Sequence, residues 1–102
     1  MPAPKTVKQR LRHDDIRHAC SDISFTRGRR YFEEGLVLSL EIDEESDNFV
    51  RFHTSIKGRM STPYKQNITL SFSAGRDALD IDGNCSCPMH YNCKHVAAAC
   101  LK

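Results

Sequence analysis

The sequence contains no run of apolar residues long enough to cross a membrane. Its first residues, Met1–Lys5, also lack the apolar stretch that is typical of a secretory signal. We therefore expect a cytoplasmic protein without a membrane partner. In that reducing compartment its five cysteines should remain thiols or bind metal, rather than form disulfides.

Two further absences argue against enzymatic chemistry. No Gly-rich phosphate loop followed by Lys-Ser or Lys-Thr occurs, so any ATPase motor must lie outside these 102 residues. The segment 82–102 contains no glutamate, which a zinc deaminase needs beside its metal ligands. We therefore expect no enzymatic activity and no catalytic residue in this chain.

The length of 102 residues predicts a single domain, and we expect it to be monomeric. The net charge is only +2, but it is unevenly distributed. Residues 1–35 contain eight basic and five acidic residues, whereas residues 41–47 contain five acids and no base. This asymmetry predicts one basic face on a domain that is not a polycation overall.

The pattern along the chain predicts an α+β fold. Residues 1–12 are basic and poor in apolar residues, and are predicted to form a flexible arm before a single domain over residues 13–102. Helices are expected at 14–20 and at 24–34, with Ser24 as the N-cap of the second helix and Gly35 at its end. Gly28 would weaken that helix, so it could serve a close approach of another backbone segment.

After Gly35 the apolar period changes from helical to two, which predicts an antiparallel meander with one solvated face. Turns are expected at 43–48, 57–59 and 74–77. The residues predicted to mark the buried faces of the four strands are Leu36, Leu38, Leu40, Ile42, Val50, Phe52, Ile56, Tyr64, Ile68, Leu70, Phe72, Leu79 and Ile81.

A last helix is predicted near the C-terminus, with Asn92 as its N-cap. Apolar residues then recur at helical spacing, which predicts one apolar stripe formed by Cys93, Val96, Ala97, Cys100 and Leu101. The stripe is still running at Lys102, so we expect the sequence to be a fragment of a longer protein.

The strongest chemical signal is Cys85-Ser86-Cys87 followed by Cys93-Lys94-His95. These eleven residues offer three thiolates and one imidazole, which is the ligand set of a closed tetrahedral zinc site. A closed site has no open position for water or substrate. We therefore predict one structural Zn²⁺ bound by Cys85, Cys87, Cys93 and His95.

Alternatives to this ligand set remain open at this point. His90 lies between the two cysteine pairs and could replace His95 as the fourth ligand. A strained disulfide between Cys85 and Cys87 is a further alternative. Cys20 and Cys100 are expected to be small buried apolar groups rather than ligands.

The motif Cys-x-Cys-x5-Cys-x-His, followed by Val96-Ala97-Ala98-Ala99, resembles the SWIM zinc finger. Residues 25–37, Lys57-Gly58-Arg59 and Pro63-Tyr64 resemble the segments that precede this finger in the N-terminal domain of bacterial Swi/Snf-type helicases. The resemblance covers about residues 22–101. It implies a DNA-binding or protein–protein interaction module attached to an ATPase, with the four residues named above as metal ligands.

Two functions are therefore expected to compete. One is non-specific DNA binding, single- or double-stranded, by Arg27, Arg29, Arg30 and Lys94, with stacking on Tyr31, Tyr64 and Tyr91. The alternative is a protein-interaction module that docks on a motor domain or another protein through the final helix or an exposed edge strand.

Overall fold

The computed structural model describes residues 7–58, 61–72 and 79–102. Four helical segments and four strands follow one another along the chain. The helical segments are the 3-10 helix η1 (Lys8–Arg10), α1 (His13–Cys20), α2 (Asp22–Glu33) and α3 (Lys94–Leu101). The strands are β1 (Val37–Glu45), β2 (Phe49–Ile56), β3 (Tyr64–Phe72) and β4 (Leu79–Cys85).

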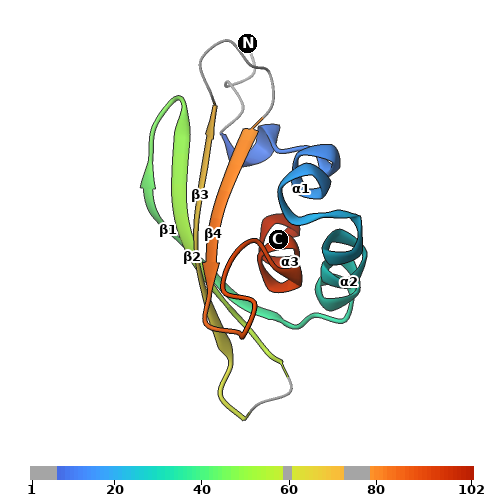
Figure 1. Ribbon diagram of the computed structural model, residues 1–102. Helices are drawn as coiled ribbons and strands as arrows, with labels where there is room; N and C mark the ends of the chain where they lie inside the picture. The colour runs from blue at the N-terminus through green and yellow to red at the C-terminus, as the bar shows by residue number, and fades with distance from the viewer. Residues whose placement is uncertain (1–6, 59–60, 73–78) are drawn as a thin grey trace.

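The strands form one antiparallel sheet in the order β1-β2-β3-β4, which confirms the predicted meander. The helices lie on one face of this sheet, and α3 lies between the sheet and the outer helices α1 and α2 (Figure 1). The α+β class and the zinc-ligand segment before the last helix are as predicted. Of the predicted turns, 74–77 and Arg59 lie outside the described residues.

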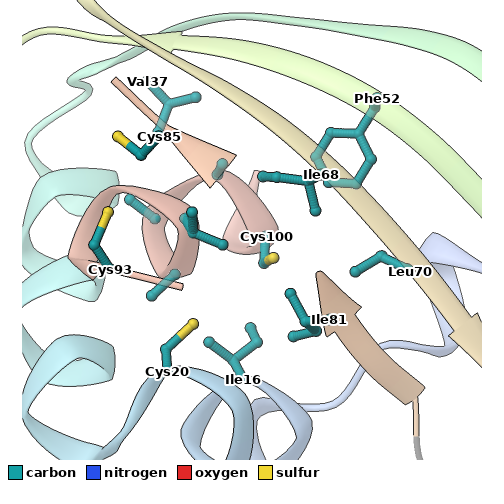
Figure 2. Close-up of a cluster of buried hydrophobic side chains, with 14 of the residues drawn as sticks. Ile16, Cys20, Val37, Phe52, Ile68, Leu70, Ile81, Cys85, Cys93 and Cys100 are labelled. Carbon is teal, nitrogen blue, oxygen red and sulfur yellow. The ribbon is translucent and has the colours of Figure 1, made fainter. Parts of the chain in front are cut away.

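The inner face of the sheet carries the core. Phe52 pairs with Ile68 across β2 and β3, and Leu70 pairs with Ile81 across β3 and β4. Each of these four side chains is buried, which confirms the period of two in these strands. Figure 2 shows Cys100 of α3 inside this core, where the apolar faces of α1 and the sheet meet.

Strand β1 differs from its prediction. Leu38 and Ile42 are 53% and 45% exposed, whereas the odd-numbered Val37 is buried. An irregularity between Val37 and Ser39 shifts the register, and β1 is an edge strand that extends beyond the cover of the helices. The even-numbered residues therefore do not form a buried face, because a period of two identifies a shared side of a strand but not what covers it.

The segment 7–12 is a second difference, because it packs against the domain. Val7 is buried in the core, and the guanidinium of Arg10 lies 4.2 Å from the ring centroid of Phe72. The ammonium of Lys8 similarly lies 5.8 Å from the ring centroid of Phe52. The prediction of a flexible arm is therefore wrong for residues 7–12, since one apolar residue and two cation–π contacts hold them in place. Residues 1–6 lie outside the described part of the chain.

The N-cap of α2 is Ser21 and not Ser24. The Ser21 hydroxyl accepts a hydrogen bond from the backbone N–H of Ser24 at 3.3 Å, so Ser24 already lies within the first turn. Ser21 has a φ of 85°, and this backbone conformation lets α1 end and α2 begin at the same residue. The helix therefore starts earlier than predicted.

The crossing of α2 and α3 depends on Gly28. A Cβ atom at this position would lie 2.5 Å from the carbonyl oxygen of Lys94 and 2.7 Å from the Cβ of Ala97. The predicted close approach of another backbone segment is confirmed, and that segment is α3.

Helix α3 is covered on every side. All residues from His95 to Cys100 are buried, because the sheet lies against one side and α1 and α2 against the other. The prediction of a single apolar stripe is therefore incomplete, because residues on every side of this helix are buried. The alanines 97–99 are small enough to let neighbouring elements approach from several directions.

Candidate metal centre

Four side chains converge where β4 leads into α3. The potential ligand atoms of Cys85, Cys87, Cys93 and His95 all lie within 4.8 Å of one another, and all four residues are buried. His95 Nδ1 lies 3.6 Å from the sulfurs of both Cys85 and Cys93. The sulfurs of Cys87 and Cys93 are 3.5 Å apart.

These separations fit a zinc ion. With Zn–S bonds of about 2.3 Å and Zn–N bonds of about 2.0–2.1 Å, a tetrahedral site needs S···S distances of about 3.8 Å and S···N distances of about 3.6 Å. The three separations given above match these edges to within a few tenths of an ångström, and the other ligand pairs lie within 4.8 Å of each other. Nδ1 is the imidazole nitrogen that faces the sulfurs. The site therefore suits one structural Zn²⁺ bound by three thiolates and one imidazole.

A tight loop between the two cysteine pairs closes the site. The backbone N–H of Cys85 donates to the carbonyl of His90 at 2.7 Å, and the N–H of His90 donates to the carbonyl of Cys87 at 3.0 Å. His90 and Asn92 have φ values of 63° and 41°, so the chain reverses through two left-handed residues. This reversal provides the backbone curl that Cys85 and Cys87 need in order to face one metal.

Asn92 holds the loop against the sheet instead of capping α3. Its side-chain oxygen accepts the N–H of Gly83 at 2.9 Å, and its amide nitrogen donates to the carbonyls of Ile81 and Ala19 at 3.0 and 3.3 Å. The N-cap position of α3 is Cys93. The predicted capping role of Asn92 is therefore wrong. Its side chain instead connects the zinc loop, β4 and α1.

Gln66 is a supporting residue that sequence reasoning missed. Its side chain is fully buried, accepts the Thr54 hydroxyl at 2.7 Å and donates to the Cys85 sulfur at 3.3 Å. Hydrogen bonds of this kind orient a metal ligand and stabilise its negative charge. The sequence carried one signal for this role, since Gln66 is a polar residue on the buried face between Tyr64 and Ile68.

Two tyrosines fix the imidazole ring of His95. The ring centroid of Tyr31 lies 5.2 Å from that of His95 in an edge-on arrangement, and the centroid of Tyr64 lies 4.8 Å away. A Cβ at Gly58 would clash with the ring of Tyr64, so the glycine lets the backbone pass close beside it. His95 Nε2 is buried without a hydrogen-bond partner in the described part of the chain.

The ligand thiols perturb one another. A hydrogen bond with Cys93 lowers the pKa of the Cys85 thiol, with further help from His95 and Gln66, while burial acts in the opposite direction. The same hydrogen bond with Cys85 raises the pKa of Cys93, and burial raises it further. Without a metal, the cluster thus accommodates negative charge on Cys85 and disfavours it on Cys93. A divalent cation removes this conflict, because it stabilises all the thiolates together.

The remaining cysteines are core residues, as predicted. Cys20 and Cys100 are 6% and 4% exposed, and both are free thiols. Burial raises the pKa of Cys20 to about 12 and raises that of Cys100 as well. Cys85 and Cys87 are also free, so no disulfide takes the place of the metal site.

The closed four-ligand geometry defines a structural zinc finger, in which the metal holds a loop to the start of a helix. The family model of the SWIM zinc finger matches residues 69–102, which include the end of β3, all of β4, the ligand loop and α3. The C-terminal third of the chain is therefore similar to the SWIM zinc finger, and its four clustered ligands support one structural zinc.

Other comparisons add no further relative. No curated protein and no solved structure gives a significant match to the chain. Among the described residues, no helix is both long enough and apolar enough to cross a membrane.

Substitution of His90 tests whether His95 is the fourth zinc ligand. The backbone of His90 makes hydrogen bonds with the backbones of Cys85 and Cys87 at 2.7 and 3.0 Å. Its side chain is exposed and is not part of the four-residue cluster. We expect His90→Ala to keep one zinc per chain, with a small loss of stability from its positive φ. Zinc content by metal analysis checks this, and His90→Asn is the control that tolerates the same φ. Loss of zinc in both variants would contradict the assignment of His95.

The structure separates the four predicted basic residues. Arg27 and Lys94 line the same pocket beside the zinc centre, although they come from different helices. Arg29 makes an exposed salt bridge with Glu33 at 2.9 Å, and Arg30 is exposed outside that pocket. The predicted cluster on α2 is therefore divided, and only Arg27 joins Lys94.

Proposed function

We propose that this chain is a zinc-stabilised accessory domain that binds DNA and is attached to a helicase or another ATPase motor. The observation that carries the proposal is the meeting of Arg27 and Lys94 at one pocket beside the zinc centre. The domain acts as a monomer in the reducing cytoplasm and has no catalytic residue of its own. Four protein ligands fill the zinc coordination sphere, which leaves no position for a reacting water.

The two cations are available for phosphate groups. Among the residues that the structure describes, the salt bridges involve other bases, and neither Arg27 nor Lys94 is paired with a carboxylate. The Lys94 ammonium lies 5.3 Å from the ring centroid of Tyr31, which holds the charge near the pocket. Positions fixed in this way suit electrostatic contacts with a nucleic-acid backbone.

Binding is expected at the zinc end of the domain alone. Arg10 stacks on Phe72 at the end of β3, whereas Tyr64, which lines the zinc-side pocket, begins the same strand. Arg10 thus lies at the opposite end of β3 from the pocket. A short contact surface with two main cations predicts weak, non-specific binding.

The salt dependence of DNA affinity tests this function. Two phosphate contacts predict that affinity for a labelled oligonucleotide falls about tenfold between about 50 and about 200 mM salt, because binding releases condensed counterions. Fluorescence anisotropy of the zinc-loaded domain measures this change. Absence of binding at low salt, or an affinity that does not respond to salt, would contradict the proposal.

Protein–protein interaction is the second candidate function, and strand β1 favours it. Leu38 and Ile42 expose large apolar side chains on an edge strand, whose outer side has no neighbour in the sheet. Such an edge can accept a strand from a partner. The final helix does not support this candidate, because α3 is already buried within the domain.

A further inference from the structure

A pocket of about 320 Å³ lies between α2 and the zinc loop. One side is formed by α2, which contributes Ser24, Arg27 and Tyr31, and the other by the zinc loop and the start of α3. A cavity of this volume is at the lower end of the range that binds small organic ligands. A volume of about 320 Å³ is large enough for more than a single ion but far too small for a DNA duplex.

Charge determines how a ligand could lie in this pocket. Cys87 and Cys93 line its inner side, and Zn²⁺ with three thiolates and a neutral imidazole carries a net charge of −1. Arg27 and Lys94 add two positive charges, so the lining as a whole is positive. An anionic group is therefore expected beside the two cations and away from the sulfurs.

One ring nitrogen of His95 has no hydrogen-bond acceptor among the described residues. His95 lines the pocket, and this nitrogen is its buried Nε2. Because Nδ1 faces the metal ligands, the ring proton belongs on Nε2. Metal-bound histidines almost always donate this second N–H to an acceptor, but Nε2 is buried, so a pocket ligand reaches it only if neighbouring side chains move.

The rings of Tyr31 and Tyr64 already contact other groups of the domain. The ring of Tyr64 has His95 on one side and Gly58 close to its edge, and Tyr31 contacts both His95 and Lys94. Stacking of a base on Tyr31 or Tyr64 stays a prediction, and it would have to share these rings with His95 and Lys94.

The outer wall of the pocket offers an apolar surface instead. Met89 lines the pocket and is 68% exposed, and Pro88 precedes it in the zinc loop. A polarisable thioether and a proline ring can pack on the face of a flat heterocycle. The pocket thus combines cations for a phosphate with an apolar wall for a base.

We propose that this pocket binds one unpaired nucleotide of a single DNA strand, with its phosphate between Arg27 and Lys94 and its base on Met89. This inference rests on the proposed DNA-binding function and adds a preference for single strands. A base stacked inside a duplex cannot enter the pocket, whereas an unpaired base can leave its neighbours at low cost.

The test compares a fluorescent oligo-dT strand with a fully paired hairpin, using the zinc-loaded full chain. Arg27→Gln and Met89→Ala should each weaken single-strand binding by roughly tenfold and affect the hairpin much less. Arg30→Gln is the matched control, because it removes an equal charge from the exposed part of α2 outside the pocket. It should weaken both forms slightly and equally. Unlabelled dTMP should compete with the strand more strongly than inorganic phosphate.

The outcomes distinguish a failure of the nucleotide pocket from a failure of the proposed DNA-binding function. Equal effects of Arg27→Gln and Arg30→Gln on both forms of DNA would overturn the nucleotide pocket while leaving general DNA binding in place. Equal competition by dTMP and inorganic phosphate would also overturn it, because only a phosphate would then be recognised. No binding of either DNA at low salt would refute the proposed function and the pocket together.

Discussion

Replacing Cys93 by serine is expected to unfold the whole domain and not only the zinc loop. Cys93 begins α3, and α3 lies buried between the sheet and the outer helices. Structural zinc contributes on the order of 10 kcal/mol of folding free energy in small fingers, whereas a typical domain has a net stability of about 5–15 kcal/mol. Loss of one ligand is therefore expected to remove most or all of the net folding free energy that keeps α3 in the core.

Thermal unfolding followed by circular dichroism, together with zinc analysis, measures this effect. Cys93→Ser should show no cooperative transition and less than one bound zinc per chain, and an excess of chelator should have the same effect on the unmodified chain. Cys20→Ala is the matched control, since it also removes a buried thiol but none of the ligands. It should keep its zinc and lose about 1 kcal/mol. Native amide dispersion with one zinc in Cys93→Ser would refute the site.

Gly28→Ala should destabilise the domain although alanine is the better helix former. In an isolated helix the substitution would gain about 1 kcal/mol. Here the new methyl group would lie 2.5 Å from the Lys94 carbonyl oxygen and 2.9 Å from the backbone nitrogen of Ala98. Backbone atoms cannot move aside as a flexible side chain can, so α2 and α3 must separate. Overpacking of this kind costs about 1–3 kcal/mol.

Urea denaturation gives the free energy of unfolding for this variant. We expect Gly28→Ala to lose about 2 kcal/mol, and Gly28→Val to lose more because it is larger and β-branched. Thr26→Ala provides the control on the same helix, because Thr26 is exposed and its replacement should be neutral or slightly stabilising. A Gly28→Ala variant as stable as the unmodified chain would show that the two helices can separate without cost.

The metal site could be predicted from the sequence because its ligands are close together in the chain. Thiolates and imidazoles at these spacings form few other structures, so Cys85, Cys87 and Cys93 were identifiable without a fold, whereas the choice of His95 over His90 needed the structure. The period of two in β2 and β4 was equally informative, because both strands have one buried face. In each case the residues that act together are close in the sequence, so their spacing alone predicts their arrangement.

The remaining features depend on contacts between distant segments. Gln66 supports Cys85 from a neighbouring strand, and Asn92 bonds to Ala19 across 73 positions, so the partner of neither residue can be read from local sequence. The exposure of Ile42 depends on where the helices stop covering the sheet, and the burial of Val7 depends on the core that it reaches. A sequence pattern defines the side of an element, whereas the covering of that side is a property of the whole fold.

The central position of α3 has a consequence for folding during protein synthesis. The sheet and the outer helices are complete in sequence by Cys85, yet α3, which fills the space between them, follows them in the chain and leaves the ribosome after them. Until residues 94–101 emerge and the ligands bind zinc, the apolar face of the sheet has no α3 to pack against. With synthesis at about 5–20 residues per second, this interval lasts on the order of a second. Nascent chains of this domain should therefore depend on chaperones until the metal is bound.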